Sequence, residues 1–177
     1  MKRRNAAAAV AGLVLSSTSL ADGIPAPAPT LRYAFTVRAE LVPPVEQGTI
    51  DGGRRRFIAI TGGQVYGPSL AGVVLAGGGD WQTILPNGLT KVEAHYFLQA
   101  SDGAVIEVTN RGVRTATPDV IEKLAKSIDV DPSAYYFRTT PHFAVANGPH
   151  DWLNRHAFVA RGIRKPDHVL IDFYEVE

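Results

Sequence analysis

Three short segments of the sequence each place an aromatic ring beside a charged or amide side chain. Residues 77–81 read Gly-Gly-Gly-Asp-Trp, residues 135–138 read Tyr-Tyr-Phe-Arg, and residues 151–154 read Asp-Trp-Leu-Asn. All three segments are predicted to lie on neighbouring strands of one small β-domain. Gathered inside a barrel, such pairs would form a pocket with an aromatic wall and a few fixed polar contacts, which suits a small organic ligand.

Asp80 and His95 are the candidate acid–base residues. Inside a cavity and against the indole of Trp81, the pKa of Asp80 would rise towards neutrality, because desolvation disfavours the carboxylate. His95 stands within a strand pattern and could supply a catalytic imidazole. Each residue also has a structural alternative: Asp80 could cap the backbone amides of the preceding glycines, and His95 could be an ordinary core histidine.

A further set of side chains is predicted to bind the substrate. Arg111 and Arg138 could bind a carboxylate, a phenolate or a carbonyl oxygen that develops negative charge. For each of these arginines the alternative is a structural ion pair, for instance with Glu107 or Asp172. The other predicted ligand contacts are aromatic or amide side chains: Trp81, Tyr136, Trp152, Asn154 and Tyr174.

Several kinds of chemistry lack the residues they need. The chain has no cysteine, which rules out disulfides, thiolate metal sites and cysteine nucleophiles. Its five histidines show neither His-x-His nor His-Glu-x-x-His spacing, so we predict no metal site and no cofactor. Ser69 is not in a Gly-x-Ser-x-Gly nucleophile elbow. The three consecutive glycines do not open a helix, so they do not form a phosphate-binding loop.

The N-terminal segment reads as a secretory signal peptide. Lys2, Arg3 and Arg4 precede an apolar run over residues 6–15, and Ser19 and Ala21 supply the small residues of a cleavage site. An N-terminal membrane anchor is the alternative, but the apolar run is short for a spanning helix. We therefore expect a signal peptide over residues 1–21, a proline-rich spacer over 22–30 and one domain over 31–177, periplasmic or secreted and without membrane association after cleavage.

The charge balance argues against a nucleic-acid partner. The full chain of 177 residues has 18 basic and 17 acidic side chains. Removal of the three basic residues of the signal peptide would leave 15 basic against 17 acidic side chains, a net charge of −2. A near-neutral domain of this kind lacks the basic surface that nucleic-acid binding requires.

The remaining pattern predicts a mainly β fold, a single antiparallel β-barrel with one short α-helix. Asn87-Gly88 and Asp102-Gly103 predict hairpin turns, because both residue types accept positive φ. Thr117-Pro118 predicts the start of the helix. The expected strands cover residues 31–42, 57–61, 69–76, 81–85, 90–100, 104–110, 135–145, 151–161 and 168–176.

The order of these motifs resembles the DUF3237 (UPF0311) family of uncharacterised bacterial and fungal proteins. The likeness rests on residues 55–63, 67–72, 77–81 and 135–139, with residues 152–154 and 169–176 fitting as well, and it extends from about residue 31 to the end. It implies a β-barrel-like domain that assembles as a small oligomer, and it brings no established activity. The chain departs from the family in two ways. Members mostly look cytoplasmic, whereas a predicted signal peptide and a proline-rich spacer precede the domain of this chain. Members also more often carry arginine where this chain has His95.

Two classes of function follow from these features. The first is a lyase, isomerase or hydratase that acts without a cofactor on an aromatic or polyketide-like compound. Asp80 or His95 would be its base, and Tyr136, Arg138 and Asn154 would position the substrate. The alternative is a non-catalytic periplasmic protein that binds a hydrophobic metabolite in the same pocket. Ionisable cavity groups with shifted pKa would favour the enzyme, and a pocket whose polar groups are all paired would favour the binding protein.

Overall fold

The computed structural model describes residues 26–177 of the chain. The predicted signal peptide, residues 1–21, therefore lies outside the described residues. In the described part, no helix has both the length and the apolar character needed to cross a membrane.

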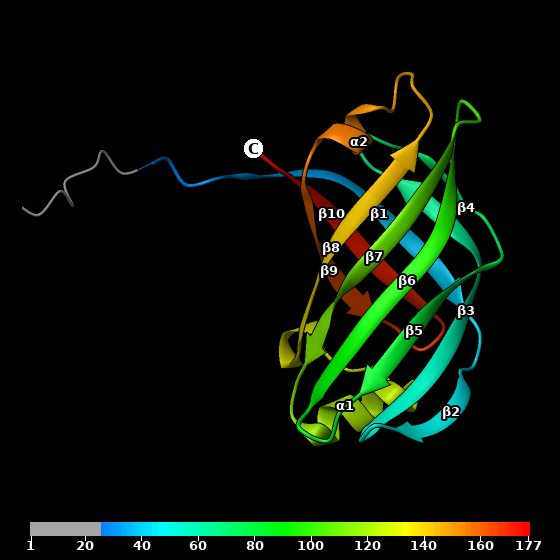
Figure 1. The fold of residues 1–177 in the computed structure, drawn as a ribbon, viewed down its shortest axis with the longest axis vertical. Helices are drawn as coiled ribbons and strands as arrows, with labels where there is room; N and C mark the ends of the chain where they lie inside the picture. The colour runs from blue at the N-terminus through cyan, green and yellow to red at the C-terminus, as the bar shows by residue number, and fades with distance from the viewer. Residues whose placement is uncertain (1–25) are drawn as a thin grey trace, which may run out of the picture.

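One antiparallel sheet closes on itself to form a barrel of eight strands, with two further strands added to it (Figure 1). Closure occurs where the first strand pairs with the third as well as with the last. The strands are β1 (Leu31–Leu41), β2 (Val45–Ile50), β3 (Gly53–Tyr66), β4 (Gly72–Val74), β5 (Gly78–Ile84), β6 (Leu89–Ala100), β7 (Val105–Thr115), β8 (Tyr136–Val145), β9 (Phe158–Arg164) and β10 (His168–Val176). β2 pairs only with β3, whereas β4 and β5 both lie between β3 and β6.

Period-two alternation decides which side chains enter the barrel. In β6, the buried residues Val92, Tyr96 and Leu98 alternate with the exposed residues Glu93 and His95. Such alternation is expected for a strand with one face on the core and one face in water. The two hairpin turns at Gly88 and Gly103 form as predicted, with φ of 83° and 89°.

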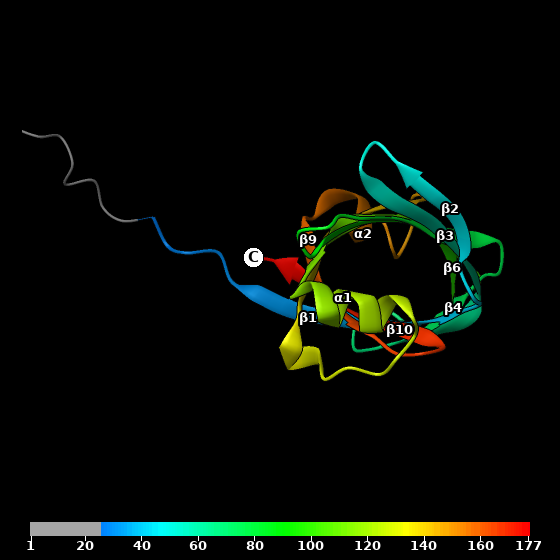
Figure 2. The ribbon, with the colours of Figure 1, turned by 90° about the horizontal axis from the view of Figure 1, so that it is seen from below.

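The two ends of the barrel differ. Figure 1 shows α2 (Trp152–Arg155) at one end and α1 (Pro118–Ala125) at the other, and Figure 2 shows α1 lying across its end of the barrel. At the α2 end, the rings of Phe35, Phe143, Phe158 and Phe173 pack with centroids 4.8–6.0 Å apart. This end is therefore filled by apolar core.

The predicted barrel, its single regular helix and most strands are confirmed. The strand predicted over residues 151–161 is wrong in its first half, where residues 152–155 form a helical turn. Asp151 there pairs with Arg155 one turn later. The hairpin of β2 and β3 was not predicted, because all six residues of β2 are exposed and show no apolar alternation. Its turn is nevertheless an Asp-Gly pair, Asp51-Gly52, with positive φ at both residues.

Candidate functional site

The barrel contains a partly open internal cavity in which the centre of a water-sized sphere can occupy about 40 Å³. Its apolar wall includes Ala39, Leu41, Ile60, Val92, Val169 and Ile171. Its polar lining comprises Asp80, Gln82, Tyr96, Asn110, Arg114, Thr139 and Arg164. An apolar wall with a few convergent polar groups is typical of a small-molecule site.

The cavity has a polar lining because two strands, β7 and β5, carry polar side chains on part of their inward faces. In β7, the inward residues Ile106 and Val108 are followed by Asn110 and Arg114 on the same face. In β5, Asp80 and Gln82 face inward beside the exposed Trp81. The barrel is thus apolar towards α2 and polar towards α1.

Asp80 is the central carboxyl of the cavity. It lies in register with Ala94 of β6, which in turn lies in register with Asn110 of β7. The small side chain of Ala94 leaves space between the two polar residues. The Oδ2 atom of Asp80 accepts a hydrogen bond from Gln82, whereas Oδ1 is buried and has no partner within residues 26–177.

This environment raises the pKa of Asp80 above its ordinary value. Desolvation by burial is the largest cause, and it outweighs the hydrogen bond from Gln82 and the charges of Arg114 and Arg56, which act in the opposite direction. Compared with an ordinary aspartate, Asp80 therefore keeps its proton, which it can donate, to a higher pH.

Arg114 is fully buried beside this carboxyl. None of its three side-chain nitrogens has a hydrogen-bond partner among the described residues. Burial, together with the charges of Arg56 and Arg164, lowers the pKa of Arg114 to about 10, so the guanidinium stays charged at neutral pH. Its central carbon lies 5.6 Å from the centroid of the Phe137 ring. That ring packs on Gly162, where an added Cβ would come within 2.3 Å of the ring.

Two further arginines lie around the polar half of the barrel. Arg56 is buried and donates to Oε1 of Gln82 at 2.7 and 3.0 Å and to the carbonyl of Ala125 at 2.9 Å. Gln82 therefore connects Arg56 to Asp80.

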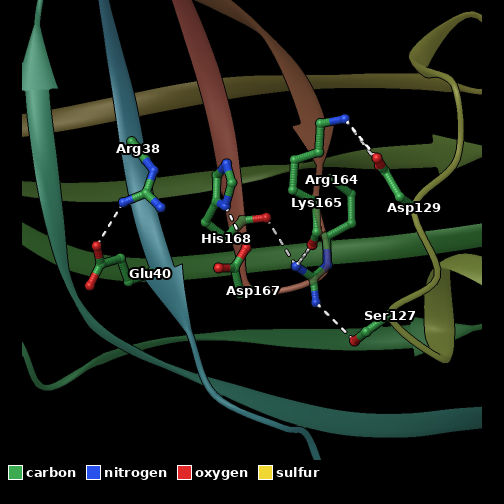
Figure 3. A network of polar contacts seen from close by, with 8 residues as sticks. All are labelled: Arg38, Glu40, Ser127, Asp129, Arg164, Lys165, Asp167 and His168. Carbon is green, nitrogen blue, oxygen red and sulfur yellow. Dashed lines mark hydrogen bonds and ion pairs between the residues drawn. The ribbon is translucent and has the colours of Figure 1, made fainter.

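Arg164 is the last residue of β9 and lies near the segment that follows α1 (Figure 3). Its guanidinium donates to the carbonyl oxygens of Lys165 and His168 and contacts the hydroxyl of Ser127 just after α1. Lys165 pairs with Asp129 at 3.0 Å. These contacts fix the segment after α1 to the barrel.

Three neutral polar groups complete the lining. The Tyr96 hydroxyl, Asn110 Oδ1 and the Thr139 hydroxyl are buried and lack partners in the described part of the chain. Burial raises the pKa of Tyr96, so its hydroxyl remains a hydrogen-bond donor. Buried polar groups in proteins are usually paired, so these groups need partners from outside the protein, such as water or a polar ligand in the cavity.

Of the side chains predicted to form the site, only Asp80 lines this cavity. His95 and four of the predicted binding residues occupy outward positions of their strands, so they do not line this cavity. The outward residues are Trp81, His95, Arg111, Tyr136 and Arg138. Since side chains alternate between faces, each is the immediate neighbour of an inward residue.

The outward residues have partners on the barrel surface. His95 contacts Glu107 at 2.7 Å, and Arg111 pairs with Glu93 at 2.8 Å. Arg111 thus forms a structural ion pair, the predicted alternative to substrate binding, although its partner is Glu93 and not Glu107 or Asp172. Trp81 packs against Phe57 with ring centroids 4.8 Å apart. The guanidinium of Arg138 lies 5.0 Å from the ring of Tyr136.

The last three predicted contacts also lie away from the cavity. Trp152 packs on Phe158 at the α2 end, with ring centroids 5.6 Å apart. Both polar atoms of the Asn154 side chain bond the backbone of Val145, at 2.8 and 3.0 Å. Tyr174 packs against Tyr33 on the outside of the barrel. These three residues have structural contacts that explain their positions.

Sequence reasoning missed Arg114, Tyr96, Asn110, Gln82 and Thr139. The signal that identifies them is alternation. Arg114 and Asn110 continue the apolar face of Ile106 and Val108 in steps of two, and a charged residue on such a face is unusual. Among residues 26–177, no group of three or more His, Asp or Glu side chains has the arrangement of a metal site.

The sequence and the fold both match known proteins. The family described as "Protein of unknown function (DUF3237)" matches residues 29–176. A UPF0311 protein of Rhodopseudomonas palustris is 40% identical over 150 residues, which cover 84% of this chain and 98% of the relative. The crystal structure of a conserved protein of unknown function from R. palustris has a TM-score of 0.82 at 38% identity, covering 86% of this chain and 100% of the other.

A fungal protein provides a more distant match. The hydroalkoxylation enzyme phnH of Penicillium herquei is 34% identical over 81 residues, which cover 46% of this chain and 54% of the fungal protein. The crystal structure of an enzyme from P. herquei has a TM-score of 0.66 at 22% identity, covering 88% of this chain and 99% of the other, and this likeness shows the shared fold.

Proposed function

The chain belongs to the DUF3237 family, and we propose that it is an exported enzyme that catalyses acid–base addition or elimination on a small aromatic or polyketide-like compound in the barrel cavity. One observation carries this proposal. The buried carboxyl of Asp80, with its raised pKa, shares a cavity with an unpartnered guanidinium and several unpartnered hydrogen-bonding groups. Proton donors of this kind are found where desolvation tunes a carboxyl for catalysis.

Asp80 would be the proton donor and acceptor. In an addition, its proton forms the new C–H bond with the π electrons of a C=C bond, while the oxygen of a hydroxyl group forms a bond to the other carbon. The proton of that hydroxyl returns to Asp80, so the carboxyl is regenerated. Elimination is the reverse. Arg114 would stabilise negative charge that develops on a substrate oxygen, and Tyr96 and Asn110 would orient the substrate.

The named activity of the fungal relative is consistent with this chemistry, because hydroalkoxylation is the addition of an O–H group across a C=C bond. The unpaired polar lining also favours an enzyme over a binding protein. A protein that only carried a hydrophobic metabolite would pair such groups with each other or replace them by apolar residues.

The test is a thermal-shift screen of the protein against aromatic acids, enones and lactones, followed by incubation of each stabilising compound with the enzyme in D₂O. Mass spectrometry should show a chemically altered compound or deuterium bound to carbon. Asp80→Asn should abolish this change, because an amide cannot exchange the proton. The exposed variant Asp119→Asn is the matched control. Recovery of every stabilising compound unchanged and undeuterated between about pH 5 and about pH 9 would identify a binding protein instead.

A further inference from the structure

The polar half of the barrel holds more positive than negative charge. Arg56, Arg114 and Arg164 are all buried, and none of them forms an ion pair with a carboxylate of residues 26–177. Asp80 is the one carboxyl lining the cavity within these residues. The buried Glu175 contacts Arg32 and His156 elsewhere, so it does not balance this charge.

The partners of two of these arginines are neutral. Arg56 is bound by the amide of Gln82 and a backbone carbonyl, and Arg164 by two backbone carbonyls and the hydroxyl of Ser127. Neutral oxygens satisfy the N–H groups of a guanidinium but leave its charge uncompensated. A buried charge without a counter-charge is expensive, and proteins generally pair it.

Arg114 differs from the other two because its Nε and both Nη atoms are free of protein partners in the described region. A guanidinium edge formed by Nε and one Nη presents two parallel N–H donors, and their spacing matches the two oxygens of a carboxylate. The opposite wall, which includes Leu41, Val169 and Ile171, would contact an apolar body.

We propose that the ligand of this cavity is a small organic carboxylate whose two oxygens bind the guanidinium of Arg114 and whose apolar body packs on the wall of Leu41, Val169 and Ile171. This inference rests on the proposed function for its site, but it specifies the charge of the substrate, which the proposed function leaves open. The carboxylate supplies the missing counter-charge, and it holds the rest of the molecule near Asp80 for proton transfer.

The experiment compares carboxylates with the amides of the same shape: acetate with acetamide, benzoate with benzamide, and cinnamate with cinnamamide. Thermal unfolding is measured for the wild type, Arg114→Met and Arg155→Met, a matched control at an exposed ion pair of α2. At least one carboxylate should raise the Tm of the wild type and of Arg155→Met by several degrees more than its amide does. Arg114→Met should weaken binding of that carboxylate by roughly 30-fold or more, because the buried charge pair is lost.

Two further measurements do not depend on the folding of Arg114→Met. Arg114→Lys keeps the charge but not the two parallel donors, and it should bind the carboxylate less tightly than the wild type. In a wild-type crystal soaked in sodium bromide, the anomalous signal should place the halide beside the guanidinium of Arg114.

The possible failures are distinguishable. If no carboxylate stabilises the wild type more than its amide, or if bromide is absent from the cavity, the inference is wrong, while a neutral compound that the enzyme converts would leave the proposed function intact. If phenolates stabilise the protein and carboxylates do not, the inference is equally wrong. If a carboxylate binds through Arg114 but never exchanges deuterium in D₂O, the inference holds and the proposed function fails.

Discussion

Asp80 and Arg114 line one cavity, yet neither a hydrogen bond nor an ion pair joins them. The positive charge of Arg114 lowers the pKa of Asp80, and Asp80 raises that of Arg114, but desolvation is larger in both cases. Each group is therefore held in an unfavourable environment. Such local destabilisation is a common property of active sites, where the fold tolerates it for the sake of function.

Asp80→Asn should stabilise the protein at neutral pH. Because the pKa of Asp80 is raised in the folded state, its stabilising contribution is fully present below the unfolded pKa of about 3.9 and is lost as pH rises through the folded pKa. The free energy of unfolding of Asp80→Asn relative to the wild type should therefore increase with pH and then level off. Urea unfolding between about pH 4 and about pH 9 measures this. The exposed control Asp119→Asn should show no such increase, and a wild type that gains stability relative to Asp80→Asn as pH rises would contradict the assignment.

Arg114→Met should also stabilise the fold while abolishing ligand binding. The substitution replaces a buried, unpartnered cation by an apolar side chain of similar length, which should raise the free energy of unfolding by about 1–4 kcal/mol. It also removes a charge that lowers the pKa of Asp80, so that pKa should rise further. Chemical denaturation measures the free energy of unfolding, and carbon NMR of the Asp80 carboxyl measures its pKa. A destabilised Arg114→Met would mean that the guanidinium has protein partners in solution.

Gln82→Leu should destabilise the protein strongly. Gln82 accepts two hydrogen bonds from the buried Arg56 and donates one to Asp80, so leucine would leave the guanidinium and the carboxyl short of partners. Each hydrogen bond to a charged group typically contributes about 1.5–3 kcal/mol, and this variant loses two of them to Arg56. Gln82→Glu is the matched control, since it keeps an acceptor for Arg56, and it should unfold at a higher urea concentration than Gln82→Leu. Equal stability of the two variants would show that Gln82 does not hold Arg56.

His95→Ala and Arg111→Met should leave ligand binding and catalysis unchanged. Both side chains lie on the outer face of the barrel in exposed pairs, with Glu107 and Glu93. Exposed pairs of this kind typically contribute about 0–1 kcal/mol to stability. Ligand-induced Tm shifts and turnover of each variant should equal those of the wild type. A loss of turnover in either variant would place the site on the outer face.

Much of the fold could be predicted from the sequence because its signals are local. Alternating strands, Asn-Gly and Asp-Gly turns and a proline at the start of the helix each act over a few residues. The helical turn at residues 152–155 could not be distinguished from a strand, because Asn154 folds it by bonding Val145 nine residues earlier. Val145 lies in β8, so a pattern within residues 151–155 does not reveal this contact.

The site was harder to predict because the register of each strand decides which side chains face the cavity. Asp80 was identified through its neighbours, but the same reasoning selected Trp81 and His95, which point outward. Aromatic neighbours in the sequence lie on opposite faces of a strand, so adjacency is a poor guide to a shared pocket. A better criterion for cavity residues is a polar residue on the same face of a strand as several apolar residues. Asn110 and Arg114 meet it, because they share a face of β7 with Ile106 and Val108.

Asn154→Ala should destabilise the protein without changing its affinity for the ligand. The Asn154 side chain donates to the carbonyl of Val145 and accepts from its N–H, which ties α2 to the end of β8 at the opposite end of the barrel from the polar residues. Loss of two such bonds should reduce the free energy of unfolding by about 1–3 kcal/mol. Asn154→Asp keeps the acceptor but loses the donor, so its stability should lie between those of the wild type and Asn154→Ala. Urea unfolding gives this order, and titration with a stabilising compound should give the same Kd for all three proteins. A Kd that weakens in Asn154→Asp without loss of stability would instead show that this amide contacts the ligand.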